Sequence, residues 1–502
     1  MWALMGSAGR LCGSSAESPL LSPNSRMIAL FDVPLAAFVG WLLWHSLEWP
    51  MVGDATFFHF IAVQMQMGAL PYRDIVDIQM PLMYLIHAAI VATIGTSDVA
   101  WRVFDVAAAT VMAGLILMLV CPAGRPAAIL AVLLMLATHL LLGPYATGQR
   151  DYLMSIPILA AALASLRAVD HRERPRFFLF LVGAFAMTAA SIKPSGILLA
   201  GLPALTSGGL RWRDAMWIIA GAAAVGLLVL VILIAWGALG PFRAMIWELW
   251  PIYAQLDMRS IPQILRDAAL WLAPIGGLAL AAALSLAAPK PPRVRLMIGL
   301  ACFGLVHLLI QRKGYSYHVY PLGVGLACWG AWSLAALPRW RAGLCLAVVA
   351  ATLVAEATRL DALLSPADPF PRAAASMQSA LESRLPRGAR VQTLDTDNGA
   401  FLAMARAGMR QATRHIMYFP LILGGDSVRR EFIDALKAHP PAAMLLTNSQ
   451  WPMAFGFEAT EQWPEFASML ASHYVLDRSG EEQPIAWRLY LRRTPPLDAP
   501  VR

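Results

Sequence analysis

The stretch WPMVGDATFFHFIAVQMQMGALPYRDIVDIQMPLMYLIH, residues 49–87, places three acids and an arginine directly after an apolar run long enough to cross a membrane. These four residues are Asp54, Arg73, Asp74 and Asp77. Ionisable side chains next to the hydrocarbon region are costly in free energy, so by default they are candidates for function. We therefore expect the chemistry of this protein to begin at Asp54.

The composition excludes a soluble globular protein. The 502 residues are 58% hydrophobic and only 14% charged, whereas soluble domains carry about 25% charged residues. The net charge of +8 would suit nucleic acid, but the basic residues lie in short loops between apolar runs, which is typical of membrane orientation. No basic module with stacking aromatics is present, so we exclude a nucleic-acid partner. The five cysteines lie in the N-terminal tail or in apolar runs, and they predict neither a disulfide framework nor a zinc site.

The apolar runs predict a polytopic membrane protein with about eleven transmembrane helices, each long enough for about 30 Å of hydrocarbon apart from one short run. Residues 1–26 are polar and poorly patterned, so we interpret them as a disordered tail rather than a signal peptide. Residues 27–356 form the predicted transmembrane domain. The predicted spans lie near residues 27–48, 100–121, 127–143, 152–168, 177–192, 195–206, 214–237, 268–288, 296–311, 319–337 and 342–356.

One further run, from Pro81 to Gly95, decides the orientation of the chain. As a helix its roughly 15 residues would cover only about 22 Å, and its flanking Pro and Gly suit a helix that lies along the interface. If it does not cross, the basic loops all face the cytoplasm, as the positive-inside rule requires. The first external loop is then 49–99, and Asp54, residues 148–151, Lys193 and residues 311–318 all face the outside.

After residue 356 the pattern changes to mixed polarity, which predicts a small external α/β domain over residues 357–502. Its role is open at this point: it either recognises a substrate or covers a site formed by the external segments. We expect a helix over 427–438 and β-strands over 390–394, 442–447, 474–477 and 487–491.

The first external loop holds one candidate catalytic residue. Asp54 follows Gly53 and precedes an apolar segment, so it could simply be the N-cap of an interfacial helix. Alternatively it is a general base whose pKa is raised by partial desolvation. Tyr72, Arg73, Asp74 and Asp77 either form a surface ion pair of little energetic weight or position sugar hydroxyls.

The other external segments carry most of the candidate cations. Arg150 and Asp151 could simply lie at the start of a helix, with the arginine at the level of the lipid headgroups and the acid favoured by the helix dipole. Alternatively, Arg150 binds a phosphate group through two hydrogen bonds. Lys193 interrupts an apolar stretch between two short pieces, which is tolerated only where such a break lines a cavity. The remaining candidates form either an interface belt or a binding site for a lipid phosphate, and they are Arg312, Lys313, Tyr315, Tyr317 and His318.

A single carboxylate together with several cations favours transfer of a group from a lipid-linked phosphate. Hydrolysis of a glycoside needs a second carboxyl group to protonate a poor leaving group. A phosphate leaving group instead needs positive charge where negative charge develops, together with a base for the acceptor hydroxyl.

The chain resembles a bacterial member of the GT-C superfamily of glycosyltransferases that use polyprenyl-phosphate sugars, related to the protein mannosyltransferases and aminoarabinose transferases. The similarity covers roughly residues 27–320, through the opening stretch, DVAWRVFDV, GQRDYL, IKPS and KGYSYHVYP. It implies that Asp54 is the catalytic base, and that Arg150 and Asp151 belong to the loop against the donor. Relatives often have a second acid where this chain has Ala55, and a basic residue before the position of Pro81. No acidic pair suits a divalent ion, so we predict no metal and no other cofactor.

We therefore predict a multi-pass glycosyltransferase of the bacterial inner membrane, with its active site and C-terminal domain on the periplasmic face. It is expected to move a sugar from a polyprenyl-phosphate donor to a periplasmic glycan, lipid, protein or other cell-envelope acceptor. Asp54 is the predicted base, and Arg150, Lys193, Arg312, Lys313 and His318 are predicted to bind the lipid phosphate. Two alternatives remain: a glycan polymerase or ligase with a lipid-pyrophosphate donor, and a transporter or flippase of an anionic lipid. Sugar or acceptor binding is assigned to Tyr72, Arg73, Asp74, Asp77, Asp151, Tyr315 and Tyr317.

Overall fold

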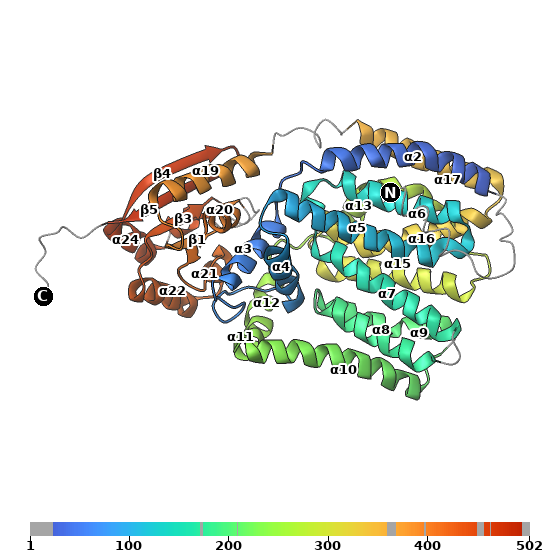
Figure 1. Ribbon diagram of the computed structural model, residues 1–502, viewed down its shortest axis with the longest axis horizontal. Helices are drawn as coiled ribbons and strands as arrows, with labels where there is room; N and C mark the ends of the chain where they lie inside the picture. Colours follow the sequence, from blue (N-terminus) through green and yellow to red (C-terminus); the bar gives the residue numbers. More distant parts are fainter. Residues whose placement is uncertain are drawn as a thin grey trace, which may run out of the picture. The chain divides into compact units, whose positions relative to one another are not determined.

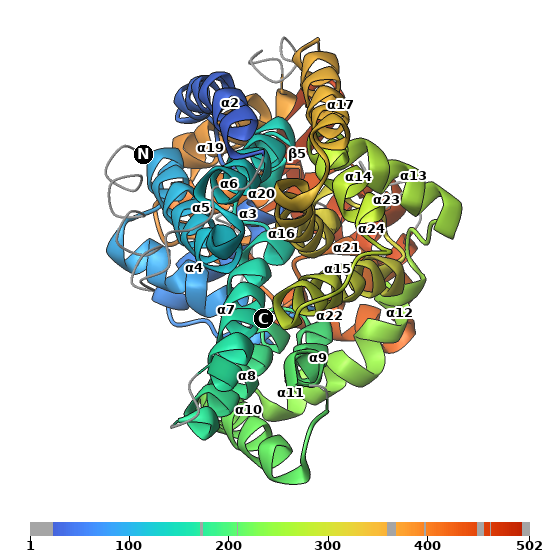
Figure 2. The same cartoon turned by 90° about the vertical axis from the view of Figure 1, so that its right-hand side faces the viewer.

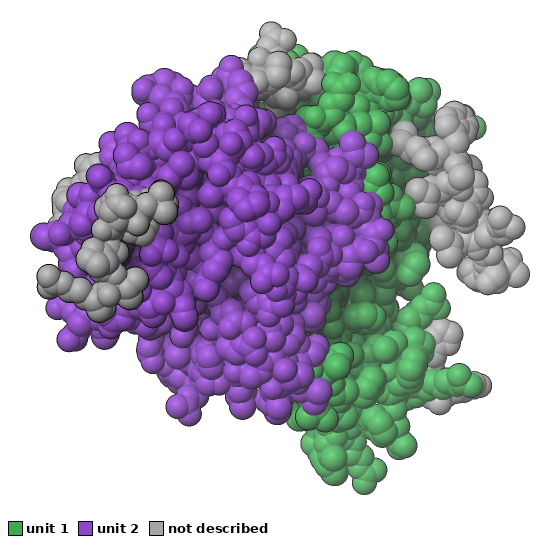
Figure 3. All heavy atoms as spheres, turned by 60° about the vertical axis from the view of Figure 1, so that its left-hand side comes forward, with its two compact units in different colours: residues 1–49, 101–229, 258–365 green, residues 50–100, 230–257, 366–502 purple. Residues whose placement is uncertain are grey.

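The computed structural model describes residues 24–170, 174–207, 209–358, 368–395, 398–448, 456–461 and 463–493. The chain divides into two compact units, coloured separately in Figure 3. Unit 1 comprises Met1–Trp49, Trp101–Val229 and Met258–Ser365, and unit 2 comprises Pro50–Ala100, Leu230–Asp257 and Pro366–Arg502. Unit 2 therefore contains the first external loop as well as the C-terminal part, and the boundary predicted at residue 356 stays a prediction. Most of the predicted N-terminal tail, residues 1–23, lies outside the described residues, whereas Ser25 and Arg26 already belong to the first helix.

Unit 1 is a helical bundle, seen roughly end-on in Figure 2. Its central helix α16 packs against α6, α7, α14 and α15, and α7 packs against α8 (Figure 1). Five 3-10 turns of the described chain lie between its helices, and residues 98–100 of α5 and 230–235 of α10 belong to unit 2. The helices are α2 (Ser25–Ser46), α5 (Asp98–Val120), α6 (Arg125–Leu141), α7 (Arg150–Asp170), α8 (Pro175–Ala190), α9 (Leu202–Ser207), α10 (Trp212–Ala235), α13 (Ile261–Trp271), α14 (Gly276–Leu284), α15 (Pro292–Gln311), α16 (Tyr320–Ala336) and α17 (Arg339–Ala357), with 3-10 turns η1 (Cys121–Ala123), η2 (Pro144–Ala146), η3 (Pro194–Gly201), η5 (Ala273–Ile275) and η6 (Ser316–Val319).

Within the described residues, seven helices are long and apolar enough to cross a membrane, by length and composition. The number is eight if Ile261–Trp271 and Ala273–Leu284, which meet at 69°, form one bent span. Three shorter apolar helices, Arg125–Leu141, Pro175–Ala190 and Pro194–Thr206, coincide with predicted spans. A multi-pass membrane protein is thus confirmed, and the total of about eleven crossings stays a prediction.

Glycines allow the helices of unit 1 to approach closely. A Cβ atom on Gly304 of α15 would lie 2.2 Å from the backbone nitrogen of Leu322, and one on Gly325 of α16 would lie 2.4 Å from that of Ala301. In lipid the hydrophobic effect does not drive helices together. Small residues instead let the two backbones approach closely, so that van der Waals packing holds the helices together. The α15–α16 pair therefore depends on these glycines.

Unit 2 is built around a five-stranded sheet of order β2-β1-β3-β5-β4. β1 pairs in parallel with β2 and β3, whereas β3, β5 and β4 pair antiparallel. Helices α19 and α20 pack against each other and against strands of the sheet. The elements are α3 (Asp54–Gln66), α4 (Pro81–Thr93), α11 (Leu239–Ala244), the π-helical turn η4 (Met245–Leu249), α12 (Trp250–Gln255), α19 (Pro369–Arg384), β1 (Arg390–Leu394), α20 (Ala400–Ala407), β2 (Arg410–Gln411), α21 (Tyr418–Leu423), α22 (Asp426–Ala438), β3 (Ala443–Thr447), α23 (Phe457–Glu461), α24 (Pro464–His473), β4 (Tyr474–Glu482) and β5 (Ile485–Arg492).

The four predicted strands are confirmed as β1, β3, β4 and β5, and the predicted helix 427–438 is confirmed as α22. Strand β2 was missed because two residues are too short to show a period of two. Strand β4 extends five residues beyond its predicted end, because residues 478–482 pair with β5 as a hairpin.

Helix α3 differs from the interfacial helix expected in the first external loop. Every residue from Ala55 to Gln64 is buried. The rings of Phe57 and Phe60 each lie 5.3 Å from that of Phe401 on α20. The Gln64 amide donates to the Met409 carbonyl at 2.8 Å and accepts from the Gln411 backbone at 3.0 Å. A helix that is apolar all round is a core helix rather than an amphipathic one, and α3 is accordingly a core helix of unit 2.

The cysteines depart from expectation at one position. Cys121 is disulfide-bonded, which the sequence pattern did not predict. Cys302, Cys328 and Cys345 are free thiols.

Candidate functional site

In unit 1 the predicted cation Lys193 forms a buried ion pair. Its Nζ lies 2.7 Å from Oδ2 of Asp151, with side-chain exposures of 11% and 0%. Helix α8 ends at Ala190 and η3 begins at Pro194, so Lys193 stands in extended conformation between two short helical pieces. The break predicted from the sequence is therefore present, and Asp151 at the start of α7 provides the compensating charge that a buried ammonium needs.

Two residues of α15 that the sequence did not single out complete this cluster. His307 contacts Asp151 through Nε2, and its Nδ1 lies 2.7 Å from the hydroxyl of Ser195. Gln311 bonds to Lys193 through its carbonyl oxygen and reaches Asp151 with its amide nitrogen at 3.3 Å. A sequence signal did exist, because His307 and Gln311 are polar residues four apart on an apolar span and so share one helix face.

The remaining candidates of unit 1 surround this pair. Arg150 donates to the hydroxyl of Tyr317 at 3.5 Å, and Nζ of Lys193 lies 5.8 Å from the centre of the Tyr317 ring. Tyr317 and His318 contact edge to face at 4.8 Å, and Tyr315 contacts both rings. We call this group, with Asp151 and Lys193, the cation cluster. Its members are Arg150, Asp151, Lys193, His307, Gln311, Tyr315, Tyr317 and His318.

Arg312 and Lys313 adjoin the cluster in sequence but differ in exposure. Arg312 adopts the left-handed conformation that ends α15, with φ of 52°, and its side chain is exposed. Lys313 is only 5% exposed. The turn thus buries one of two adjacent cations, a distinction that the sequence motif alone cannot make.

A second buried polar network supports the turn before Arg150. Asp105 accepts a bond of 2.8 Å from the backbone nitrogen of Gly148, and it also contacts Arg102 and Nε2 of His139. A Cβ atom on Gly148 would lie 2.2 Å from the ring of Trp101. The GQRD segment is therefore held by contacts to α5, which were not foreseen from its sequence.

In unit 2, Asp54 is the first residue of α3. The N-cap is Gly53, whose φ of 62° suits glycine, and no side-chain cap bond is present there. The alternative that Asp54 is the N-cap is therefore wrong, because Gly53 holds that position and Asp54 is the next residue. Its position in the first turn remains favourable for a carboxylate, because backbone N–H groups there carry partial positive charge.

The PYRD segment forms a tight turn in which Tyr72 has a φ of 67°. Arg73 and Asp74 form a partly exposed ion pair of 2.7 Å. The hydrogen bond from Arg73 is the largest cause of the lowered pKa of Asp74. Tyr72 is buried, which together with the charge of Asp77 raises its pKa well above the usual range. Its hydroxyl donates to the Gln79 carbonyl at 2.6 Å.

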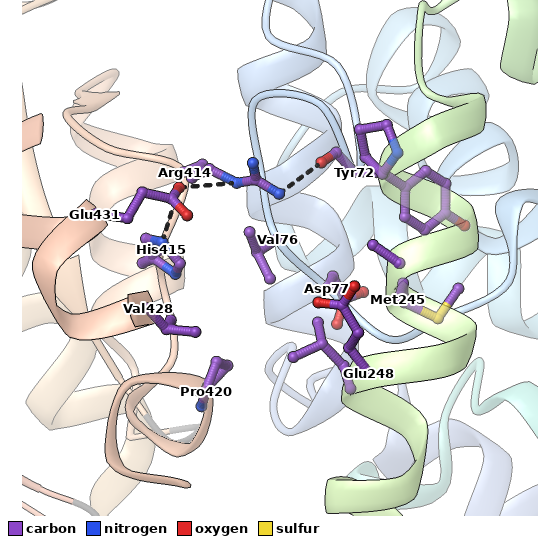
Figure 4. Close-up of a pocket in the computed structure, with 13 residues that line it drawn as sticks. Tyr72, Val76, Asp77, Met245, Glu248, Arg414, His415, Pro420, Val428 and Glu431 are labelled. Carbon is purple, nitrogen blue, oxygen red and sulfur yellow. Dashed lines mark hydrogen bonds and ion pairs between the residues drawn. The ribbon is translucent and has the colours of Figure 1, made fainter. Parts of the chain in front are cut away.

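Asp77 lines a cavity of about 90 Å³ within unit 2 (Figure 4). The buried hydroxyl of Tyr84 donates to its carboxylate. The other polar lining groups were not predicted, because three segments far apart in the sequence supply them. They are Glu248 from η4, Arg414 and His415 from the segment after β2, and Glu431 from α22.

The predicted site residues thus fall into two groups. Arg150, Asp151, Lys193, Tyr315, Tyr317 and His318 are brought together in unit 1, whereas Asp54, Tyr72, Arg73, Asp74 and Asp77 belong to unit 2. In the part of the chain that is described, no group of three or more His, Cys, Asp or Glu side chains is arranged to hold a metal ion. Chemically, the cation cluster can hold an anion, and the acids of unit 2 can accept protons or hydroxyl hydrogen bonds.

Comparison with known proteins identifies the fold. No protein-family model and no curated protein sequence matches the chain. The crystal structure of ArnT from Cupriavidus metallidurans bound to undecaprenyl phosphate matches with a TM-score of 0.61 and 13% identity, over 91% of this chain and 97% of that chain. The apo structure of the same protein matches with a TM-score of 0.60 and 12% identity over the same shares. ArnT is an aminoarabinose transferase of the GT-C superfamily, so the GT-C fold expected from the sequence resemblance is confirmed.

Proposed function

We propose, from the fold shared with ArnT, that this chain is a membrane glycosyltransferase that moves a sugar from a polyprenyl phosphate to a periplasmic glycan, lipid or cell-envelope acceptor. The observation that carries the proposal is the similarity over 91% of the chain to a structure that holds undecaprenyl phosphate. We place the chain in a bacterial inner membrane, and the basic loops support an orientation with the chemistry on the outer face.

The cation cluster supports the donor half of the proposal. Arg150, Lys193 and Lys313 are each at most 9% exposed. Buried cations in an apolar bundle suit an anionic headgroup with a long apolar tail, because the same environment accommodates both parts. Arg150 can offer a bidentate contact to phosphate oxygens. His307 and Gln311 hold Asp151, and through it the ammonium of Lys193, in one position.

Asp54 is the proposed general base. In the proposed step, the acceptor hydroxyl gives its proton to the Asp54 carboxylate while its oxygen forms a bond to C1 of the sugar. The bond between C1 and the phosphate oxygen breaks, and the electron pair leaves with the polyprenyl phosphate. Positive charge fixed in advance at the leaving phosphate lowers the barrier. With no second carboxylate as nucleophile, we expect one direct displacement with inversion at C1.

Asp151 and Arg73 have other partners that bear on their proposed roles. Asp151 is bonded to Lys193 and His307, which suits a positioning role better than contact with a sugar. Arg73 and Asp74 satisfy each other at the surface. We therefore place sugar or acceptor contacts at Tyr72, Asp77, Tyr315 and Tyr317, with Arg312 at the rim of the donor site.

The experiment that tests the proposal compares Asp54→Asn with wild-type protein in a transfer assay in nanodiscs. Loss of a general base costs about 100- to 10,000-fold in rate, so we expect kcat to fall by at least about 100-fold while the Kd for undecaprenyl phosphate stays within about threefold. Asp434→Asn, an exposed acid on α22, is the matched control and should retain full activity.

A fully active Asp54→Asn variant would remove the base assignment. The donor is tested in parallel with undecaprenyl-phosphate and undecaprenyl-pyrophosphate sugars. Turnover of the pyrophosphate donor alone would replace the proposal by the polymerase or ligase alternative. Lipid translocation without any sugar transfer would replace it by the transporter alternative.

A further inference from the structure

The cavity of unit 2 has two walls of different chemistry (Figure 4). Asp77 and Glu248 lie on one wall, and His415 and Glu431 lie on the other. Apolar surface comes from Tyr72, Val76 and Met245 on the first wall and from Pro420 on the second (Figure 4). Polar groups that converge on a partly apolar concavity are the usual composition of a small-ligand site.

The charges of the lining select against an anionic ligand. Asp77, Glu248 and Glu431 are three carboxylates, whereas Arg414 is the one permanently cationic group in the lining. Glu431 lies 3.3 Å from Nε2 of His415 and 3.7 Å from Nε of Arg414, and the hydrogen bond from His415 is the largest cause of its lowered pKa. Arg414 and His415 thus both contact Glu431, whereas the wall formed by Asp77 and Glu248 presents two carboxyl groups. Such a wall favours hydroxyl or ammonium groups and disfavours phosphate.

His415 provides an independent indication of a ligand. Its side chain is 4% exposed, and among the described residues its Nδ1 has no hydrogen-bond partner. In the tautomer whose Nε2–H donates to Glu431, Nδ1 is left as an acceptor. Buried polar atoms are nearly always satisfied, so this nitrogen needs a hydrogen-bond donor, and a molecule bound in the cavity can supply one.

The size of the cavity limits the ligand to a small group. A cavity needs about 15 Å³ of this kind of volume for one water molecule, so about 90 Å³ holds about six such positions. One pyranose ring carries a comparable number of oxygen atoms, so the cavity suits a ligand of about one sugar residue.

We propose that this cavity binds one neutral or amino-substituted sugar residue, with its hydroxyl or ammonium groups on Asp77, Glu248 and Nδ1 of His415. The assignment of that residue to the acceptor rests on the proposed function. It would make the segments 72–77, 245–248 and 414–431 an acceptor-recognition site distinct from the donor cluster of unit 1.

The binding test uses the full chain in nanodiscs and saturation-transfer-difference NMR with methyl glucoside, methyl glucosaminide and inorganic phosphate as probes. We expect transfer to the two sugars and no competition by phosphate. Glu248→Gln removes an exposed carboxylate without disturbing the core, and it should weaken sugar binding at least fivefold. Glu382→Gln, an exposed acid on α19, is the matched control and should bind as wild type does.

The contact to Nδ1 of His415 is tested by two substitutions, to glutamine and to asparagine, whose amide groups lie at different distances from the backbone. His415→Gln places its amide near the position of Nε2 and keeps the contact to Glu431, whereas His415→Asn places an acceptor near Nδ1. We expect His415→Gln to lose binding and His415→Asn to retain part of it. The proposal is overturned if neither sugar binds, if phosphate competes, or if Glu248→Gln and His415→Gln bind as wild type does.

The two proposals fail in different ways. If transfer activity exists but Glu248→Gln leaves the KM for the acceptor unchanged, the acceptor assignment fails and the proposed function stands. If no sugar is transferred but the binding pattern above is found, the proposed function fails and the sugar site stands.

Discussion

At the scale of single residues, Lys193 and Asp151 explain how the bundle tolerates an ammonium group. The two side chains are 2.7 Å apart and nearly inaccessible. His307 and Gln311 fill the remaining bonding positions of the carboxylate. A buried pair of this kind adds little net stability, but loss of one partner leaves an uncompensated charge.

We predict that Lys193→Met destabilises the protein by about 3 kcal/mol, because it leaves the Asp151 carboxylate buried without its ammonium. The double variant Lys193→Met/Asp151→Asn should recover most of this loss. Apparent thermal unfolding midpoints of detergent-solubilised protein measure the difference. Lys437→Met breaks an exposed pair with Glu465, and as the control it should cost less than about 1 kcal/mol. A double variant less stable than the single one would contradict the expectation.

The pair of Glu431 and His415 predicts an acid-dependent loss of stability. The pKa of Glu431 is lowered from 4.5 by the bond from His415. A carboxyl group with a lowered folded-state pKa stabilises the fold above its unfolded pKa, and this contribution disappears as the pH falls through the folded-state value. Wild type should therefore melt higher than Glu431→Gln at neutral pH, and the gap should close as the pH falls below the usual glutamate value of 4.5 and through the lower folded-state pKa. A gap that persists at a pH where the Glu431 carboxyl group is protonated would contradict this assignment.

At the scale of the elements, the packing of α15 decides where its polar residues lie. α15 carries His307 and Gln311, and Gly304 lies one turn before His307 against the backbone of α16. A side chain at Gly304 must push the two helices apart, because a backbone atom cannot move aside as a flexible side chain can.

We predict that Gly304→Ala lowers the unfolding midpoint, since it displaces His307 and with it the Asp151–Lys193 pair. If the cation cluster binds the donor as proposed, the variant should also bind undecaprenyl phosphate more weakly than wild type does. Gly343→Ala in α17 is the matched control, because a Cβ atom there meets nothing within 4 Å. Alanine is favoured over glycine within a helix by about 1 kcal/mol, so this control should be neutral or stabilising. Equal midpoints for the two variants would argue against close α15–α16 packing.

At the scale of the whole molecule, the basic loops predict which side of the membrane each segment faces. A cysteine at Lys437 should react with a membrane-impermeant maleimide in intact spheroplasts, whereas one at Arg293 should react only after permeabilisation. Wild-type protein gives the background labelling. The reverse pattern would place Asp54 in the cytoplasm and remove the periplasmic reaction.

The sequence by itself determined the membrane class, most helix positions and four of the five strands. Composition and periodicity are local properties, so a single segment is enough to reveal them. Asp54, Arg150 and Lys193 could be named for the same reason, because a charge beside an apolar run is visible in one dimension.

Only the tertiary structure decided which side chains meet. His307 contacts Asp151 across 156 residues, α3 is buried against α20 rather than at an interface, and three distant segments enclose the cavity around His415. Each of these depends on contacts between parts of the chain that share no local pattern. Burial and pairing of a polar group are set by its neighbours in space, and no periodicity within its own segment encodes them.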